Sequence, residues 1–185
     1  MRKPLDGLYR GALWLAALCL LAIALLVGVQ LAGRLLDGLL KLLGLAPYGL
    51  VILSLAEFAG FLLAAASFFA LAATLKAGAH IRITLVLGML SEGPRRWAEA
   101  AALAFAAVVS AYMTWQIGEF AFVSWRFNEL SPGLIPVQLW IPQAAMTAGA
   151  LVLTIALIDE LVMVLRGKRP SFRNTEDAIS LGKEG

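Results

Sequence analysis

Long runs without charged residues divide this sequence into segments of membrane-spanning length. Four uncharged runs of 23, 18, 19 and 29 residues end at Arg34, Lys76, Glu119 and Asp159. A bilayer core about 30 Å thick is crossed by about 20 apolar residues in a helix, and lipid offers no partners to unpaired backbone groups. The pattern therefore predicts four transmembrane helices, over roughly 11–33, 48–75, 97–119 and 138–165.

A further segment, residues 34–46, has a different pattern. Its polar residues recur at spacings of three and four among leucines, which is typical of an amphipathic helix. It is too short to cross the bilayer, so we expect it to lie flat on the outer membrane surface. The alternative is that it lengthens the first spanning helix. The residues that define this interfacial helix are Arg34, Leu36, Asp37, Leu39, Lys41 and Leu43.

Composition supports the membrane class. Hydrophobic residues make up 61% of the chain and charged residues 15%, against about 45–50% and 25% in soluble domains. The single cysteine and the single histidine exclude a disulfide framework and a His-rich metal cluster. No phosphate-binding loop or catalytic Ser/His/Asp set is visible, so we expect neither an enzyme nor a cofactor. The predicted fold is an all-α integral membrane protein, with one four-helix domain over 1–165 and a polar tail over 166–185.

The distribution of lysine and arginine predicts the orientation. With the N-terminus inside, the inner side holds 12 of these residues and the outer side holds 3. Positive residues concentrate on the cytoplasmic side, so both termini should be cytoplasmic. The net charge of +3 is then a topology signal, and no nucleic-acid partner is expected.

Glu57 is the main candidate for a functional residue, because it is a carboxylate within a predicted membrane span. If the second helix begins near Tyr48, Glu57 lies nine residues into it, about 13 Å deep. A carboxylate at that depth is costly unless it is paired, protonated or hydrated, so it either couples ion movement or makes a structural contact. The small residues Gly60 and Ala64 continue its face and let another helix approach closely. We favour a subunit interface formed by Glu57, Gly60 and Ala64.

The other ionisable residues near helix ends have structural explanations. His80 is expected to cap a helix end or bond to a neighbouring loop. Asp159 and Glu160 should extend to the membrane surface or pair with Arg166, and a buried role for one of them stays open.

Several of these features occur together in a known family. Glu57 is followed about twenty residues later by the junction LKAGAHIRI, which contains Gly78, His80 and Ile81. Further on come Glu129-Leu-Ser131, Pro136 and Trp140-Ile-Pro142. From about residue 8 to 165 this order resembles the small membrane subunit (Q-type) of tripartite ATP-independent periplasmic (TRAP) transporters. Ala56 and Ala70 stand where the family often has a second acid and a glycine.

The resemblance implies a role in a membrane complex. In this family a large multi-span membrane subunit moves substrate and sodium by an elevator motion. A periplasmic solute-binding protein delivers an organic acid or a carboxylated sugar. The small subunit braces the scaffold of the large one in the bacterial inner membrane, and the sodium sites belong to the large subunit.

Two other functions are considered. The first is a self-sufficient four-span exporter that carries a proton on Glu57. The strong asymmetry of lysine and arginine argues against it, because dual-topology exporters have a weak bias. The second is a quinone or haem anchor of a membrane enzyme, for which one histidine and one cysteine are a poor set of ligands.

Cysteine labelling in a Cys19→Ser background tests the predicted topology. A cysteine introduced at Ser171 should react only from the cytoplasm, and cysteines in loops 34–47 and 120–137 should react with an impermeant reagent from the periplasm. Periplasmic labelling at Ser171→Cys would contradict the assignment.

Overall fold

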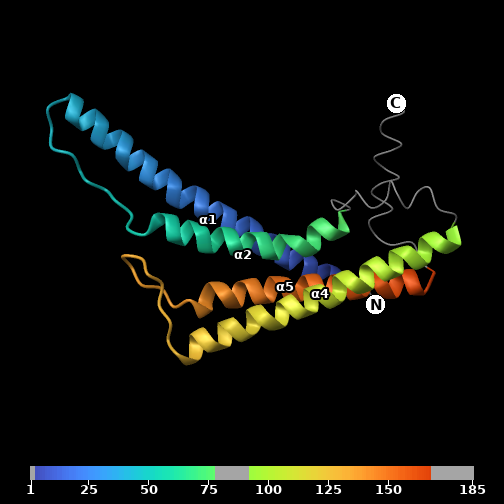
Figure 1. Ribbon diagram of the computed structural model, residues 1–185. Coiled ribbons are helices and arrows are strands. Elements are labelled where there is room, and N and C mark those ends of the chain that lie inside the picture. Colours follow the sequence, from blue (N-terminus) through green and yellow to red (C-terminus); the bar gives the residue numbers. More distant parts are fainter. Residues whose placement is uncertain (1–2, 78–91, 168–185) are drawn as a thin grey trace, which may run out of the picture.

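The computed structural model describes residues 3–77 and 92–167, and these residues form four long helices (Figure 1). All four are long and apolar enough to cross a membrane, which confirms the predicted all-α membrane fold. In the described residues the one β pairing is an isolated bridge between Leu130 and Gln138. The helices are α1 (Lys3–Leu42), α2 (Leu55–Lys76), α4 (Glu92–Arg126) and α5 (Trp140–Leu165).

The separate surface helix expected over 34–46 is not formed. Residues 34–42 are instead the last turns of α1, which has 40 residues and is therefore about 60 Å long. No proline or other break separates the apolar span from the leucine-rich segment, so helical hydrogen bonding continues through it. The structure therefore agrees with the alternative prediction, in which this segment lengthens the first helix. A helix twice as long as the hydrocarbon core must tilt or extend beyond it.

The C-terminal end of α1 is closed by a Schellman motif. Gly44 has φ of 72°, its N–H bonds to the carbonyl of Lys41, and the N–H of Leu45 bonds to the carbonyl of Leu40. This pattern satisfies the last carbonyls of a helix, and glycine adopts the positive φ without strain. The chain then reverses direction.

The loop that follows α1 runs back along it and is held at two points. The Asp37 carboxylate accepts hydrogen bonds from the backbone N–H groups of Tyr48 and Gly49, with N···O distances of 2.6 Å and 3.1 Å. Two turns earlier on α1, the buried Gln30 side chain accepts a hydrogen bond of 2.7 Å from the N–H of Ile52. Asp37 therefore orders this loop.

The second helix begins later than expected, at Leu55 and not near residue 48. Pro47 and two residues with positive φ, Gly49 (70°) and Ser54 (55°), keep residues 47–54 out of a helical conformation. This shift matters for the candidate site, because it places Glu57 in the first turn of α2.

The four helices pack as an open row in the order α1, α2, α5, α4. Residues of α1 lie against α2, those of α2 against α5, and those of α5 against α4, whereas α1 barely contacts α5. Figure 1 shows the two pairs, α1 with α2 and α4 with α5, and the Leu42 end of α1 projecting away from α4 and α5. Each helix has one end on either side of the row. We call the side that holds Lys76, at the C-terminus of α2, the Lys76 end, and the side that holds Glu57, at the N-terminus of α2, the Glu57 end.

Alanines make up half of the ten residues in the two buried clusters between neighbouring helices. One buried cluster joins α1, α2 and α5, and a second joins α4 and α5. Close backbone approach is the main source of packing energy between membrane helices, because lipid is as apolar as the side chains. The clusters contain, in order, Tyr9, Ala12, Ala72, Val152 and Ala156, and Ala100, Leu103, Ala107, Leu157 and Val164.

Helices α5 and α2 approach each other closely at Gly149. A Cβ added there would lie 2.6 Å from the carbonyl carbon of Phe68 and 2.8 Å from its oxygen. We expect Gly149→Ala to destabilise the protein by about 1–3 kcal/mol, because the clash is with backbone that cannot rotate away. Thermal unfolding in detergent measures the loss.

Gly28→Ala on α1 is the matched control. A Cβ at Gly28 meets nothing within 4 Å, so this variant should gain about 0.5–1 kcal/mol from helix propensity. Equal stability of the two variants would contradict the close α2–α5 contact.

Candidate functional site: charged contacts at the two ends of the helix row

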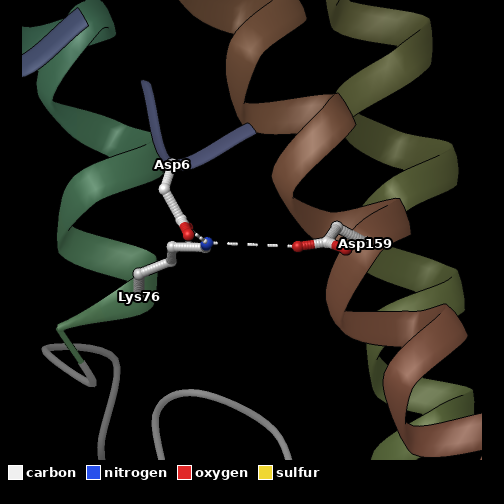
Figure 2. Close-up of polar contacts among 3 residues, drawn as sticks. All are labelled: Asp6, Lys76 and Asp159. Carbon is white, nitrogen blue, oxygen red and sulfur yellow. Dashed lines mark hydrogen bonds and ion pairs between the residues drawn. The ribbon is translucent and has the colours of Figure 1, made fainter. Parts of the chain in front are cut away.

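A cluster of three charged residues joins three helices at the Lys76 end. The Nζ of Lys76, in the last turn of α2, lies 3.0 Å from Oδ1 of Asp6 on α1 and 4.0 Å from Oδ2 of Asp159 on α5. Figure 2 shows the ammonium group between the two carboxylates. Lys76 and Asp159 are largely buried, with 18% and 16% of their side chains exposed, whereas Asp6 is about half exposed.

An aromatic ring completes the surroundings of the lysine. The Nζ of Lys76 lies 4.1 Å from the centre of the Tyr9 ring, which is a cation–π distance. Tyr9 is itself buried in the core that joins α1, α2 and α5. The cluster therefore fixes the relative positions of three helices where their apolar spans end.

A second basic residue at this end caps α5. The guanidinium of Arg96 on α4 donates to the carbonyl oxygens of Val164 and Leu165 in the last turn of α5, where helix carbonyls need partners from outside the helix. The Val164 carbonyl also accepts from the backbone N–H of Gly167. A positive charge is also favourable beside the C-terminus of a helix. Arg95 makes a salt bridge of 3.2 Å with Glu99, one turn along α4.

The expectation for the two acids of α5 needs correction. Asp159 pairs with Lys76, and no ion pair with Arg166 occurs among the described residues. Glu160 is completely buried, which is the buried role that the sequence left open. Sequence reasoning missed the Lys76 cluster because the three residues are far apart along the chain. The one available signal was that all three lie at the predicted inner end of a span.

At the Glu57 end, the Glu57 carboxylate faces its own chain. A Cβ added at Gly133, in the loop between α4 and α5, would lie 1.7 Å from Oε2 of Glu57 and 3.0 Å from Oγ of Ser54. Ser54 Oγ accepts a hydrogen bond of 3.1 Å from the N–H of Ile135 in the same loop. Glu57 Oε2 is buried and has no hydrogen-bond partner among the described residues.

This geometry changes the expected surroundings of Glu57. It lies in the first turn of α2, and not nine residues into the helix, because the helix begins at Leu55. A carboxylate in the first turn is stabilised by the helix dipole, so the position does not require a coupling role. The side chain is half buried beneath the α4–α5 loop.

The other two residues of the expected interface differ in exposure. Gly60 is exposed, and a Cβ there would meet nothing within 4 Å. Ala64, one turn further, is half buried. Of the three residues, Gly60 offers the free surface on which another helix can pack closely.

A group of hydroxyls lies between α4 and α5, about midway along the two helices. Ser110 Oγ is 2.8 Å from Thr154 Oγ1, and Thr114 Oγ1 is 3.2 Å from the same atom. Thr114 and Thr154 also donate to helix carbonyls one turn back. Within residues 3–77 and 92–167, no group of three His, Cys, Asp or Glu residues is placed to hold a metal ion.

The residues expected in the surface helix lie at the end of α1 and just beyond it. Arg34, Leu36, Leu39, Lys41 and Leu43 are exposed, and Asp37 is half buried under the loop that it binds. The junction residues Gly78, His80 and Ile81 lie outside the described residues.

Four long apolar helices in an open row define a multi-pass membrane protein. A comparison with protein families matches residues 48–167 to the DctQ component of the tripartite ATP-independent periplasmic transporters. The match covers well over half of the chain and includes α2, α4 and α5, so the chain belongs to this family of small TRAP membrane components. Comparisons with curated proteins and with solved structures gave no match.

Removing the cation of the Lys76 cluster tests its structural role. We expect Lys76→Met to lower the free energy of unfolding by about 1–3 kcal/mol, because Asp159 is left largely buried without a cation. The contribution of Asp6 should be small, since an exposed ion pair is worth about 1 kcal/mol or less. Unfolding in detergent measures the change.

Two further variants serve as controls for this experiment. Lys41→Met removes an exposed lysine and should have little effect. In the double variant Lys76→Met/Asp159→Asn the buried charge is absent, so part of the lost stability should return. If the loss of stability in the double variant equals the sum of the losses in Lys76→Met and Asp159→Asn measured singly, Lys76 and Asp159 do not interact.

Proposed function

We propose that this chain is a non-catalytic stator of a sodium-coupled TRAP transporter, bracing the scaffold of the large elevator-type subunit. The observation that carries this proposal is the open row of helices. A row exposes both of its faces to lipid or to a partner, and it does not surround an aqueous path of its own. Such a shape suits a protein that widens another membrane protein.

A fixed frame is a mechanical requirement of elevator transport. The mobile domain pushes against its scaffold as it slides, and a wider scaffold resists tilting in the bilayer. In this chain α1 and α4, about 60 and 52 Å long, exceed the thickness of the hydrocarbon core. The ion cluster of Lys76 and the close packing at Gly149 favour a rigid body.

The remaining roles are assigned to other chains of the complex. We place the sodium sites and the solute path in the large subunit, and capture of an organic acid or carboxylated sugar in the periplasmic binding protein. Both termini of this chain lie in the cytoplasm in the proposed arrangement, with the Lys76 end inside.

Glu57 has a structural role in this proposal. A proton-coupling carboxylate would need access to both sides of the membrane, whereas Glu57 lies at a helix start beneath Gly133. The exposed Gly60 is the residue of this face that contacts the large subunit.

Co-expression with the large subunit and transport in proteoliposomes test the proposal. The wild-type chain should purify with the large subunit, and Glu57→Gln should keep most transport. Gly60→Leu should lower recovery of the complex about tenfold, as expected for a clash of about 1–3 kcal/mol at a packed interface.

Gly38→Leu, at another open helical glycine, is the control and should leave recovery unchanged. If Glu57→Gln abolished transport while the complex stayed intact, the carboxylate would carry coupling and the stator role would be wrong. Transport by this chain in the absence of any partner would favour the exporter instead.

A further inference from the structure

The residues at the start of α2 have the spacing of a helix-capping motif. Ser54 is the N-cap residue of α2 and Glu57 is the third residue of the helix, so the segment Ser54-Leu-Ala-Glu57 matches a capping box. In that motif the serine hydroxyl accepts a hydrogen bond from the N–H of the glutamate, and the glutamate carboxylate accepts one from the N–H of the serine. The sequence of α2 therefore contains its own N-terminal cap.

The structure does not form this capping box. The N–H of Glu57 bonds to the carbonyl oxygen of Ser54 at 3.0 Å, and the Ser54 hydroxyl makes no capping hydrogen bond. Ser54 has φ of 55°, in the left-handed region that residues other than glycine rarely adopt, whereas an N-cap residue normally has an extended conformation. The two side chains of the motif are thus directed away from the helix that they could cap.

The loop between α4 and α5 meets both of these side chains. Oγ of Ser54 accepts a hydrogen bond of 3.1 Å from the N–H of Ile135. Oε2 of Glu57 lies so close to Gly133 that a Cβ added there would overlap it, and the atoms nearest to that Cβ all belong to Glu57 and Ser54. Oε2 is buried without a hydrogen-bond partner among the described residues, which is costly for a carboxylate. The loop therefore holds Glu57 in a position where one oxygen is unsatisfied.

The tip of this loop, residues 132–136, is suited to move as one piece. Its base is closed by two hydrogen bonds, from the N–H of Ser131 to the carbonyl of Val137 and from the N–H of Val137 to the hydroxyl of Ser131. Pro132 and Pro136 form the two ends of the tip and have a fixed φ. Four of its five residues are exposed, so little apolar burial holds the tip against α2, and such segments open at a low cost in free energy.

We propose that this tip exchanges between a closed and an open form. In the closed form, which the structure has, the tip lies on the start of α2 and engages Ser54 and Glu57. In the open form the tip moves away, Ser54 takes an extended φ, and Ser54 and Glu57 form the capping box. The two forms exclude each other, because Ser54 has a different backbone conformation in each. Their balance decides whether the α4–α5 pair is tied to α2 at the Glu57 end.

This inference goes beyond the proposed function and does not rest on it. The exchange is a property of the isolated chain, so its test needs no other subunit. The Lys76 cluster and the close contact at Gly149 hold α2 against α5 in both forms, and only the loop moves.

Hydrogen exchange measured by NMR on the isolated chain, labelled with 15N-isoleucine in detergent micelles, follows the opening. The N–H of Ile135 is bonded to Ser54 only in the closed form, so its exchange rate reports how often the tip opens. The N–H of Ile52 is the internal reference, because it also bonds to a side-chain oxygen, but to that of Gln30 on α1.

Glu57→Ala gives the decisive result. It removes the carboxylate that is satisfied only in the open form, so Ile135 should exchange about fivefold more slowly, the effect of losing one capping interaction from that form. Glu57→Gln should stay close to the wild type, because glutamine also completes a capping box. Faster or unchanged exchange of Ile135 in Glu57→Ala would mean that Glu57 merely supports the loop, and the inference would be overturned.

Gly133→Ala shifts the balance in the opposite direction. The added Cβ overlaps Oε2 of Glu57, so Ile135 should exchange about tenfold faster or more while Ile52 is unchanged. The matched control is Glu57→Ala/Gly133→Ala, in which the space for the Cβ is free and slow exchange of Ile135 should return. Unchanged exchange in Gly133→Ala, or equally fast exchange in the double variant, would also overturn the inference.

Discussion

Close contact between α2 and α5 is the constraint on which the rest of this structure depends. Gly149 lets the backbone of Phe68 approach so closely that no Cβ would fit, and Ala72 and Ala156 continue the same contact with no exposed surface. Helices in a membrane gain little from burying apolar surface, so their association depends on such close backbone packing. If α5 stood further from α2, Asp159 could not reach Lys76.

The central place of α5 explains the shape of the molecule. It is the most buried of the four helices, and it contacts α2 on one side and α4 on the other. The outer helices α1 and α4 each have one principal neighbour and expose most of their surface. An open row of this kind leaves long apolar faces that require lipid or a partner protein, which agrees with membership of a multi-subunit transporter family.

Polar residues in this protein serve mainly to fix loops and helix ends. Asp37 and Gln30 hold the loop after α1, Arg96 caps α5, and Ser54 bonds to the loop before α5. Each contact removes an unsatisfied group or restricts a connection near the membrane boundary. Glu119 is different, since its carboxylate is exposed on an apolar face and has no ion-pair partner in the described chain.

The sequence by itself determined the four helices, the membrane class and the resemblance to the TRAP family, because these follow from the lengths of uncharged runs and from local motifs. For residues 34–42 the sequence left two alternatives, and the structure has the one in which α1 continues to Leu42. Tertiary structure alone decided that Glu57 lies beneath Gly133 and that Lys76 joins Asp6 to Asp159. Hydropathy records how apolar a segment is, but it does not record which neighbour each face of a helix meets. Helix ends and long-range ion pairs depend on those neighbours.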